Sequence, residues 1–183
     1  MTCEPVLRVL ESLGAACALI GAHAMAARGH PRFAVDLNLL TTDRRVLDRA
    51  VWVDLERQGA SVDAREGDAD DPLAGVVHIL LADGSDVDVV VGKWTWETGV
   101  IARADRMPVM GAHVAVPRTS DLVLLKLAAG GYQDLHDAAA LMSLGDRAAL
   151  VADVDAHVEE VRPDVRAKWG TLRASMPGPP SPC

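Results

Sequence analysis

The hydrophobic pattern of this chain changes character at Pro117. Before Pro117, short apolar runs alternate with stretches of helical spacing, whereas after it only helical spacing recurs. Short buried runs separated by helices are typical of a sheet flanked by helices rather than of a helical bundle. We therefore predict an α/β (α+β) core with a mixed sheet over residues 1–117, and a C-terminal helical part packed on it over residues 118–175.

The predicted strands are short and end at turn signals. Asp83-Gly84 is a hairpin signal and joins two of them. The expected strands are 17–20, 35–40, 61–65, 75–81 and 86–91, with extended pieces near Val109 and Val114. The expected helices are 6–13, 22–27, one from Thr42 or Asp43 to Leu55, 120–129, 134–144 and 146 to about 161. Four prolines in the last eight residues predict a disordered tail over 176–183.

The composition narrows the class of protein. No apolar run approaches the roughly 18 residues of a membrane span, and no signal-peptide pattern opens the chain. Cys3, Cys17 and Cys183 are odd in number and lack metal-type spacing, so no disulfide framework is expected. These features predict a cytoplasmic protein without a membrane partner.

Charge is unevenly distributed along the chain, whose net value is −8. Residues 61–88 contain eight carboxylates and one cation, Arg65, while residues 12–35 contain no Asp or Glu but include Arg28 and Arg32. This distribution suits an anion held beside a divalent metal, and it equally suits an ordinary soluble surface. Net acidity argues against broad, nonspecific binding of nucleic acid.

The predicted strand 35–40 carries two oxygen ligands. Because a strand has a period of two, Asp36 and Asn38 project to one face while Val35, Leu37 and Leu39 pack inward. Carboxylate and amide oxygens on a rigid strand suit Mg²⁺, which is a hard cation.

The predicted strand 86–91 supplies further carboxylates. Asp86 and Asp88 share one face, and Asp88 is the candidate third ligand, whereas Asp86 is interpreted as an exposed residue near the turn. Trp94 and Trp96 are interpreted as packing residues in the loop that follows.

A glycine turn precedes the first polar strand. Gly21 ends a buried strand and begins a helix, so its backbone N–H groups suit a phosphate. His23, Arg28 and Arg32 follow within a short distance and are candidate nucleotide contacts, although each also fits a structural or surface role.

With these motifs in order, the chain resembles the nucleotidyltransferase superfamily typified by DNA polymerase beta, and within it the AbiEii-type, toxin–antitoxin-associated group. The resemblance spans roughly residues 5 to 145. The matching segments are 19–40, Asp86-Val87-Asp88-Val89-Val90-Val91, 121–127 and Gly131-Tyr132-Gln133-Asp134-Leu135-His136-Asp137.

The resemblance implies an enzyme that uses Mg²⁺ or Mn²⁺ to move a nucleoside monophosphate from an NTP to a hydroxyl acceptor. The acceptor could be a tRNA, a protein or a small molecule, and a toxin–antitoxin partner protein is a further expectation. The implied roles are catalysis by Asp36, Asp88, Lys126 and Asp134, nucleotide binding by Gly21, His23, Arg28, Arg32 and Lys126, and metal binding by Asp36, Asn38 and Asp88. Asp134 also fits a helix-capping role.

One residue departs from the family pattern. Asn38 stands where the family has Asp, and an amide oxygen ligates Mg²⁺ without contributing negative charge. The sequence therefore leaves three interpretations open: a weakened enzyme, a catalytically inactive nucleotide-binding protein acting as an antitoxin or regulator, and an engineered substitution.

Overall fold

The structure is a computed structural model that describes residues 2–32 and 34–176. The chain divides into two compact units. One covers the chain up to Pro117 except Arg28–His30, and the other consists of Arg28–His30 and the chain from Arg118 onward. Among the described residues, no helix has both the length and the apolar character that crossing a bilayer requires.

The first unit is built on a five-stranded mixed sheet. Its order is β1 (Cys17–Ile20), β2 (Asp36–Thr41), β5 (Asp86–Val91), β4 (Gly75–Leu80) and β3 (Ser61–Glu66). The two strands β2 and β5 run parallel, and the other neighbouring strands run antiparallel. The hairpin predicted at Asp83-Gly84 is confirmed, because β4 pairs with β5 on either side of it. The predicted fold class is also confirmed.

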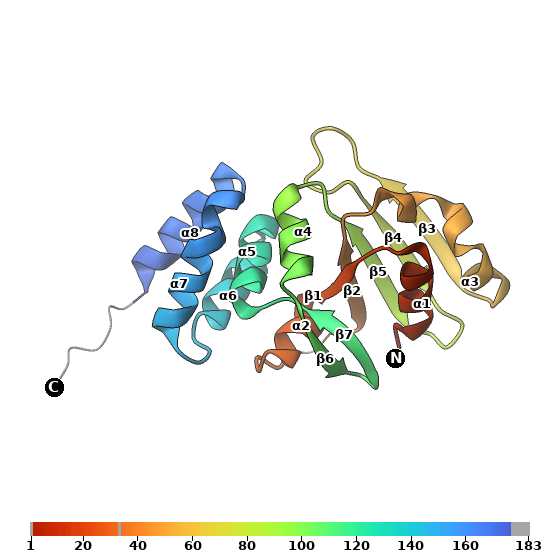
Figure 1. The fold of residues 1–183 in the computed structure, drawn as a ribbon, viewed down its shortest axis with the longest axis horizontal. Coiled ribbons are helices and arrows are strands. Elements are labelled where there is room, and N and C mark those ends of the chain that lie inside the picture. The colour runs from red at the N-terminus through yellow and green to blue at the C-terminus, as the bar shows by residue number, and fades with distance from the viewer. Residues whose placement is uncertain (1, 33, 177–183) are drawn as a thin grey trace. The chain divides into compact units, whose positions relative to one another are not determined.

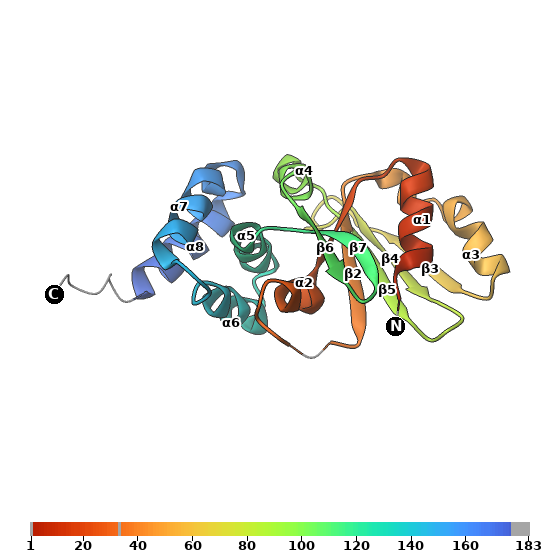
Figure 2. The same cartoon turned by 60° about the horizontal axis from the view of Figure 1, so that its bottom comes forward.

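The two faces of this sheet differ in polarity because side chains alternate along each strand. Leu37, Leu39, Val87, Val89 and Ile79 are fully buried on one face. Both views place α1 (Glu4–Leu13), α4 (Thr95–Ala102) and the hairpin of β6 (Asp105–Val109) and β7 (Ala112–Val116) on one side of the sheet (Figures 1 and 2). The buried apolar side chains belong to the side that these elements cover. The polar side chains of the same strands project to the opposite side, which we call the open face.

The helix predicted from residue 42 to residue 55 is wrong. The segment forms two 3₁₀ turns, η1 (Arg44–Leu47) and η2 (Arg49–Trp52), and then the short helix α3 (Val53–Arg57). The side chains of Asp43 and Asp48 each accept a hydrogen bond from the backbone N–H two residues later. Aspartates that bond the local backbone in this way compete with a continuous helix, which the apolar spacing alone does not reveal.

Two predictions near the ends of strands also need correction. Val35 does not pack inward, because it precedes β2 and is 60% exposed. Trp94 and Trp96 do not lie in a plain loop, since α4 begins at Thr95 and the Trp94 backbone N–H donates to the Glu97 carboxylate at 2.7 Å. Trp96 is buried, as a packing residue should be.

The second unit is helical. It contains α5 (Thr119–Ala129), α6 (Tyr132–Leu141), α7 (Arg147–His157), the 3₁₀ turn η3 (Val158–Glu160) and α8 (Pro163–Ser175). The helix α8 was not predicted, although Pro163 at its first position is a regular start signal. The core of this unit includes Leu122, Leu127, Leu141, Val154 and Trp169. Apart from Met176, the predicted disordered tail lies outside the described residues.

Candidate metal and nucleotide site

Two neighbouring parallel strands gather the polar residues of the open face. In the register of β2 and β5, Asp36 lies opposite Asp86 and Asn38 lies opposite Asp88. Directly opposed residues on paired strands share a face, so all four side chains project to the same side. Leu37 and Val87 between them are buried on the other side. The sheet therefore brings together the three residues predicted as metal ligands.

Within β2 the two predicted ligands bond to each other. The Asn38 Nδ2 donates to Asp36 Oδ2 at 2.7 Å. An aspartate at this position would carry no such donor, so the two side chains would repel each other without a cation. Asn38 thus puts an uncharged hydrogen-bond donor where an aspartate would place a second anion beside Asp36.

A residue that the sequence did not single out joins the site from β4. His78 lies opposite Asp88 in the register of β4 and β5. Its Nδ1 is 2.8 Å from Asp88 Oδ1 and 3.4 Å from Asp86 Oδ1. The hydrogen bond to Asp88, assisted by the charges of Asp86 and Asp88, raises the pKa of His78 above its ordinary value. The sequence does contain a signal for the position of His78. If the strands on either side of the Asp83-Gly84 turn pair as a hairpin, residue 78 lies opposite residue 88.

Asp86 has a larger part in this cluster than its position near a turn suggested. Its side chain is half-buried, and its Oδ1 is buried without a hydrogen-bond partner among the described residues. One ligand atom from each of His78, Asp86 and Asp88 lies within 4.8 Å of the other two. Imidazole and carboxylate groups at such separations fit a divalent cation, and the unpartnered buried oxygen is a group that a cation would satisfy.

The glycine turn lies beside the polar strand. Gly21 begins α2 (Gly21–Ala27) with φ +70°, and a Cβ built on it would lie 3.5 Å from Asn38 Nδ2. In the same helix, His23 Nε2 is buried and has no hydrogen-bond partner among the described residues. Arg32 is exposed and belongs to the same unit. The turn, His23 and the strand ligands thus belong to one unit.

The remaining predicted site residues belong to the second unit. Lys126 Nζ lies 2.9 Å from Asp134 Oδ1 and 2.9 Å from Asp137 Oδ2. The Asp137 side chain is 2% exposed and that of Lys126 14%, so this is a largely buried ion pair. Arg28 belongs to this unit as well. Nucleotide contacts by Lys126 and Arg28, and catalysis by Asp134, stay predictions.

A cavity of about 670 Å³ opens beside His78 on the first unit. Asp63 and Arg65 of β3 line it and pair with each other at 2.6 Å. Glu66 and Asp71 add two carboxylates to its wall. The neighbouring acidic loop is held by Lys93, whose ammonium donates to three backbone carbonyls within residues 68–71. The lining therefore combines three carboxylates with a single paired guanidinium.

Comparison of the structure with known ones identifies the fold. A solution structure of the antibiotic-resistance factor ANT(2'')-Ia, a nucleotidyltransferase, aligns with a TM-score of 0.55 at 17% identity, covering 93% of this chain and 92% of that one. A crystal structure of ANT(2'')-Ia in complex with adenylyl-2''-tobramycin aligns with a TM-score of 0.52 at 15% identity, covering 93% and 94%.

The fold is that of the nucleotidyltransferases. A nucleotidyltransferase-like protein from Paracoccidioides brasiliensis is also similar, with a TM-score of 0.49, 16% identity and coverage of 94% and 90%. No protein-family model and no curated protein sequence matches the chain. Identities this low establish the architecture, while the chemistry has to be argued from this chain's own residues.

Proposed function

We propose that this protein transfers a nucleoside monophosphate from an NTP to a hydroxyl acceptor in the presence of Mg²⁺ or Mn²⁺. The observation that carries the proposal is the register of β2 and β5, which lines up Asp36 with Asp86 and Asn38 with Asp88 on the open face of a nucleotidyltransferase fold. The Gly21 turn, which lies against Asn38, supports a triphosphate position next to these residues.

Each residue has a defined role in this proposal. Asp36 and Asp88, with the amide oxygen of Asn38, would hold the cation. Such a cation neutralises phosphate charge and favours in-line displacement at the α-phosphorus. Asp88 accepts the proton of the acceptor hydroxyl as the new P–O bond forms and pyrophosphate leaves. The Gly21 turn, His23 and Arg32 hold the phosphates, with Arg28, Lys126 and Asp134 as predicted contributors from the second unit.

The cavity beside His78 favours a particular class of acceptor. Its lining carries a net negative charge, from Asp63, Glu66 and Asp71 against Arg65. A tRNA would bring many phosphates to this surface, whereas a small cationic compound with hydroxyl groups would be attracted. The complex of ANT(2'')-Ia with adenylyl-2''-tobramycin shows that another protein of this fold binds a nucleotidylated small molecule. We therefore place small cationic acceptors ahead of tRNA or protein.

We also propose that the protein belongs to the AbiEii-type group and has a toxin–antitoxin partner protein. Both assignments depend on the resemblance of residues 19–40, 86–91, 121–127 and 131–137 to that group.

A second candidate function rests on a specific contact. The hydrogen bond from Asn38 stabilises the Asp36 carboxylate when no cation is bound. An uncharged second ligand weakens two-metal catalysis, and a protein with such a site can bind nucleotide as a regulator or antitoxin without turning it over.

A transfer assay separates the two functions. The chain is incubated with each labelled NTP, Mg²⁺ or Mn²⁺, and a panel of hydroxyl acceptors including tobramycin and tRNA. Transfer that is lost in Asp88→Asn and retained in Asp54→Asn, a matched change at an exposed residue of α3, supports the enzyme. NTP binding by calorimetry with no transfer, even after Asn38→Asp, supports the binding protein. Absence of both NTP binding and transfer contradicts both candidates.

A further inference from the structure

The open face of the sheet carries a more complete set of cation ligands than the Asp36–Asn38 pair. We infer that His78, Asp86 and Asp88 form the principal cation site of this chain, and that the His78 imidazole makes it prefer a first-row transition ion such as Co²⁺ over Mg²⁺. The inference rests on the proposed function, shares Asp88 with the cation ligands named there, and adds His78, Asp86 and the choice of ion. Binding of the ion does not itself require that the protein transfer anything.

The backbone places the three ligands without help from loops. Asp86 and Asp88 lie two residues apart on β5, a strand paired on both sides, and His78 lies opposite Asp88 on β4. Ligand atoms of the three residues lie within 4.8 Å of one another. Ligands on paired strands are held more firmly than ligands on loops, so little order has to be gained when the ion binds.

The Nδ1 of His78 lies where one ion could reach both carboxylates. It is 2.8 Å from Asp88 Oδ1 and 3.4 Å from Asp86 Oδ1. A contact of 2.8 Å between imidazole nitrogen and carboxylate oxygen requires a shared proton. A bound ion takes the place of that proton, and the His78 ring then carries its proton on Nε2.

Asp86 supplies further support. Its Oδ1 is buried and finds no hydrogen-bond partner among the described residues. Most buried polar atoms in proteins have such a partner, so an exception of this kind calls for an ion or water. The same atom lies 3.4 Å from His78 Nδ1, an ion-pair separation that does not meet the geometry of a hydrogen bond. A cation between them would satisfy it.

The neighbouring pair on β2 is the weaker site. Asp36 is not a member of the close cluster, and one of its oxygens accepts the amide hydrogen of Asn38. Asn38 adds no charge. Strand β2 therefore offers one carboxylate, whereas β4 and β5 offer two carboxylates and an imidazole.

The choice of ion follows from the ligand set. Mg²⁺ favours oxygen ligands and keeps several waters, whereas imidazole suits the softer first-row transition ions. A site with one imidazole nitrogen and two carboxylates should therefore bind such transition ions more tightly than Mg²⁺. His78 is the residue that would confer this preference.

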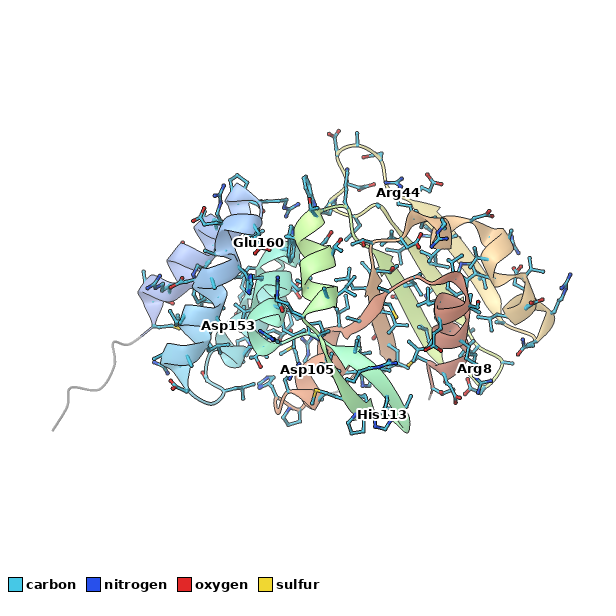
Figure 3. All side chains as sticks on the ribbon, in the orientation of Figure 1. Arg8, Arg44, Asp105, His113, Asp153 and Glu160 are labelled. Atoms are coloured by element: carbon cyan, nitrogen blue, oxygen red, sulfur yellow. The ribbon has the colours of Figure 1, made fainter. Side chains whose placement is uncertain are left out.

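The test is a titration of the full chain with Co²⁺, without nucleotide, by calorimetry and visible absorption. It is repeated with Mg²⁺ present in excess, and with His78→Asn and His113→Asn. The control residue His113 is an exposed histidine on the β6–β7 hairpin (Figure 3). Thermal unfolding without metal checks that each variant is folded, and Asp86→Asn serves as the second variant if His78→Asn is not.

The inference expects the unaltered chain to bind a single Co²⁺ that excess Mg²⁺ does not displace. It expects His78→Asn to weaken Co²⁺ binding at least about tenfold, the effect of losing a metal-site residue, and His113→Asn to bind as the unaltered chain does. Equal Co²⁺ affinity in the unaltered chain and His78→Asn, preferred binding of Mg²⁺, or no Co²⁺ binding would each overturn it.

The outcome also separates this inference from the proposed function. Co²⁺ binding that depends on His78, without nucleotide transfer in any ion, leaves the site standing and removes the enzyme. Transfer that depends on Asp88, together with Co²⁺ affinity that is unchanged in His78→Asn, leaves the enzyme standing and removes this site.

Discussion

Asn38 is the residue on which the interpretation of the site depends most. Its amide donates to Asp36 Oδ2 at 2.7 Å and lies against the Gly21 turn. It therefore lies beside two features that the proposed function uses for different purposes: the Asp36 carboxylate as a cation ligand, and the Gly21 turn as a phosphate contact. A substitution at Asn38 should therefore affect the Gly21 turn, and a substitution at Gly21 should affect Asn38.

Asn38→Asp should make stability depend on metal. The variant loses the hydrogen bond and places a second anion beside Asp36, so we expect the free energy of unfolding without metal to fall by about 1–2 kcal/mol. Added Mg²⁺ should restore it, because the ion binds the folded state. Melting curves with and without Mg²⁺ measure this. The matched control is Gln58→Glu, at an exposed position at the end of α3, and an equal metal response in both variants would contradict the prediction.

Gly21→Ala should affect both stability and the site. An alanine at φ +70° costs about 1–2 kcal/mol of stability, and its Cβ would contact the Asn38 amide. Gly14→Ala is the control, since Gly14 has the same φ but no atom within 4 Å of such a Cβ. We expect similar losses of thermal stability in the two variants and weaker NTP binding, by calorimetry, in Gly21→Ala alone. Equal NTP affinity in both would remove the turn from the site.

At the scale of the element, the pairing of strands brings the candidate site residues together. The packing of two helices determines the ion-pair partners of Lys126. Helices α5 and α6 bring the Lys126 ammonium within 2.9 Å of both Asp134 and Asp137. The cation is thus compensated within its own unit. Its structural role can be measured separately from the predicted contact with a triphosphate.

Lys126→Met should destabilise the protein strongly. The substitution keeps the length of the side chain but leaves the buried Asp137 carboxylate without its ammonium partner, which costs roughly 3–5 kcal/mol for a fully buried pair and less here because Asp134 is partly exposed. Lys168→Met is the comparison, because Lys168 is more exposed and pairs with the exposed Asp164 at 3.5 Å. Denaturant unfolding of the two variants measures the difference. A loss for Lys126→Met no larger than that for Lys168→Met would show that the ion pair contributes little.

At the scale of the whole molecule, charge decides which acceptors can approach. The net charge is −8, and the cavity beside His78 is lined by three carboxylates and one guanidinium. An acidic protein with an acidic cavity attracts cationic compounds and repels polyanions over the range of the screening length.

Binding of a cationic acceptor should therefore weaken as salt is added. With tobramycin as the probe, we expect affinity by calorimetry to fall between about 0.1 M and about 1 M salt, as the screening length shortens from about 10 to about 3 Å. Glu66→Gln should reduce the affinity at low salt, whereas Glu159→Gln, an exposed change in the second unit, should not. Salt-independent binding, or tighter binding of tRNA than of tobramycin, would contradict the proposed acceptor class.

The sequence by itself determined the fold class and most of the elements of the sheet. Period-two alternation and the Asp83-Gly84 turn were sufficient for β4 and β5, because both signals are local. The same local rules predicted that Asp36 and Asn38 share a face. They failed for residues 42–55, where Asp43 and Asp48 bond their own backbone and interrupt a helix that the apolar spacing favours.

Only the tertiary structure decided which side chains meet. The parallel pairing of β2 with β5 joins segments separated by the whole β3–β4 hairpin, and its register, which sets Asp36 opposite Asp86, follows from the packing of their buried faces. The contacts of His78 with Asp88 and with Asp86 arise in the same way. Periodicity specifies the face of a strand that a side chain occupies, whereas its neighbours across the sheet depend on how distant segments bury their apolar surface together.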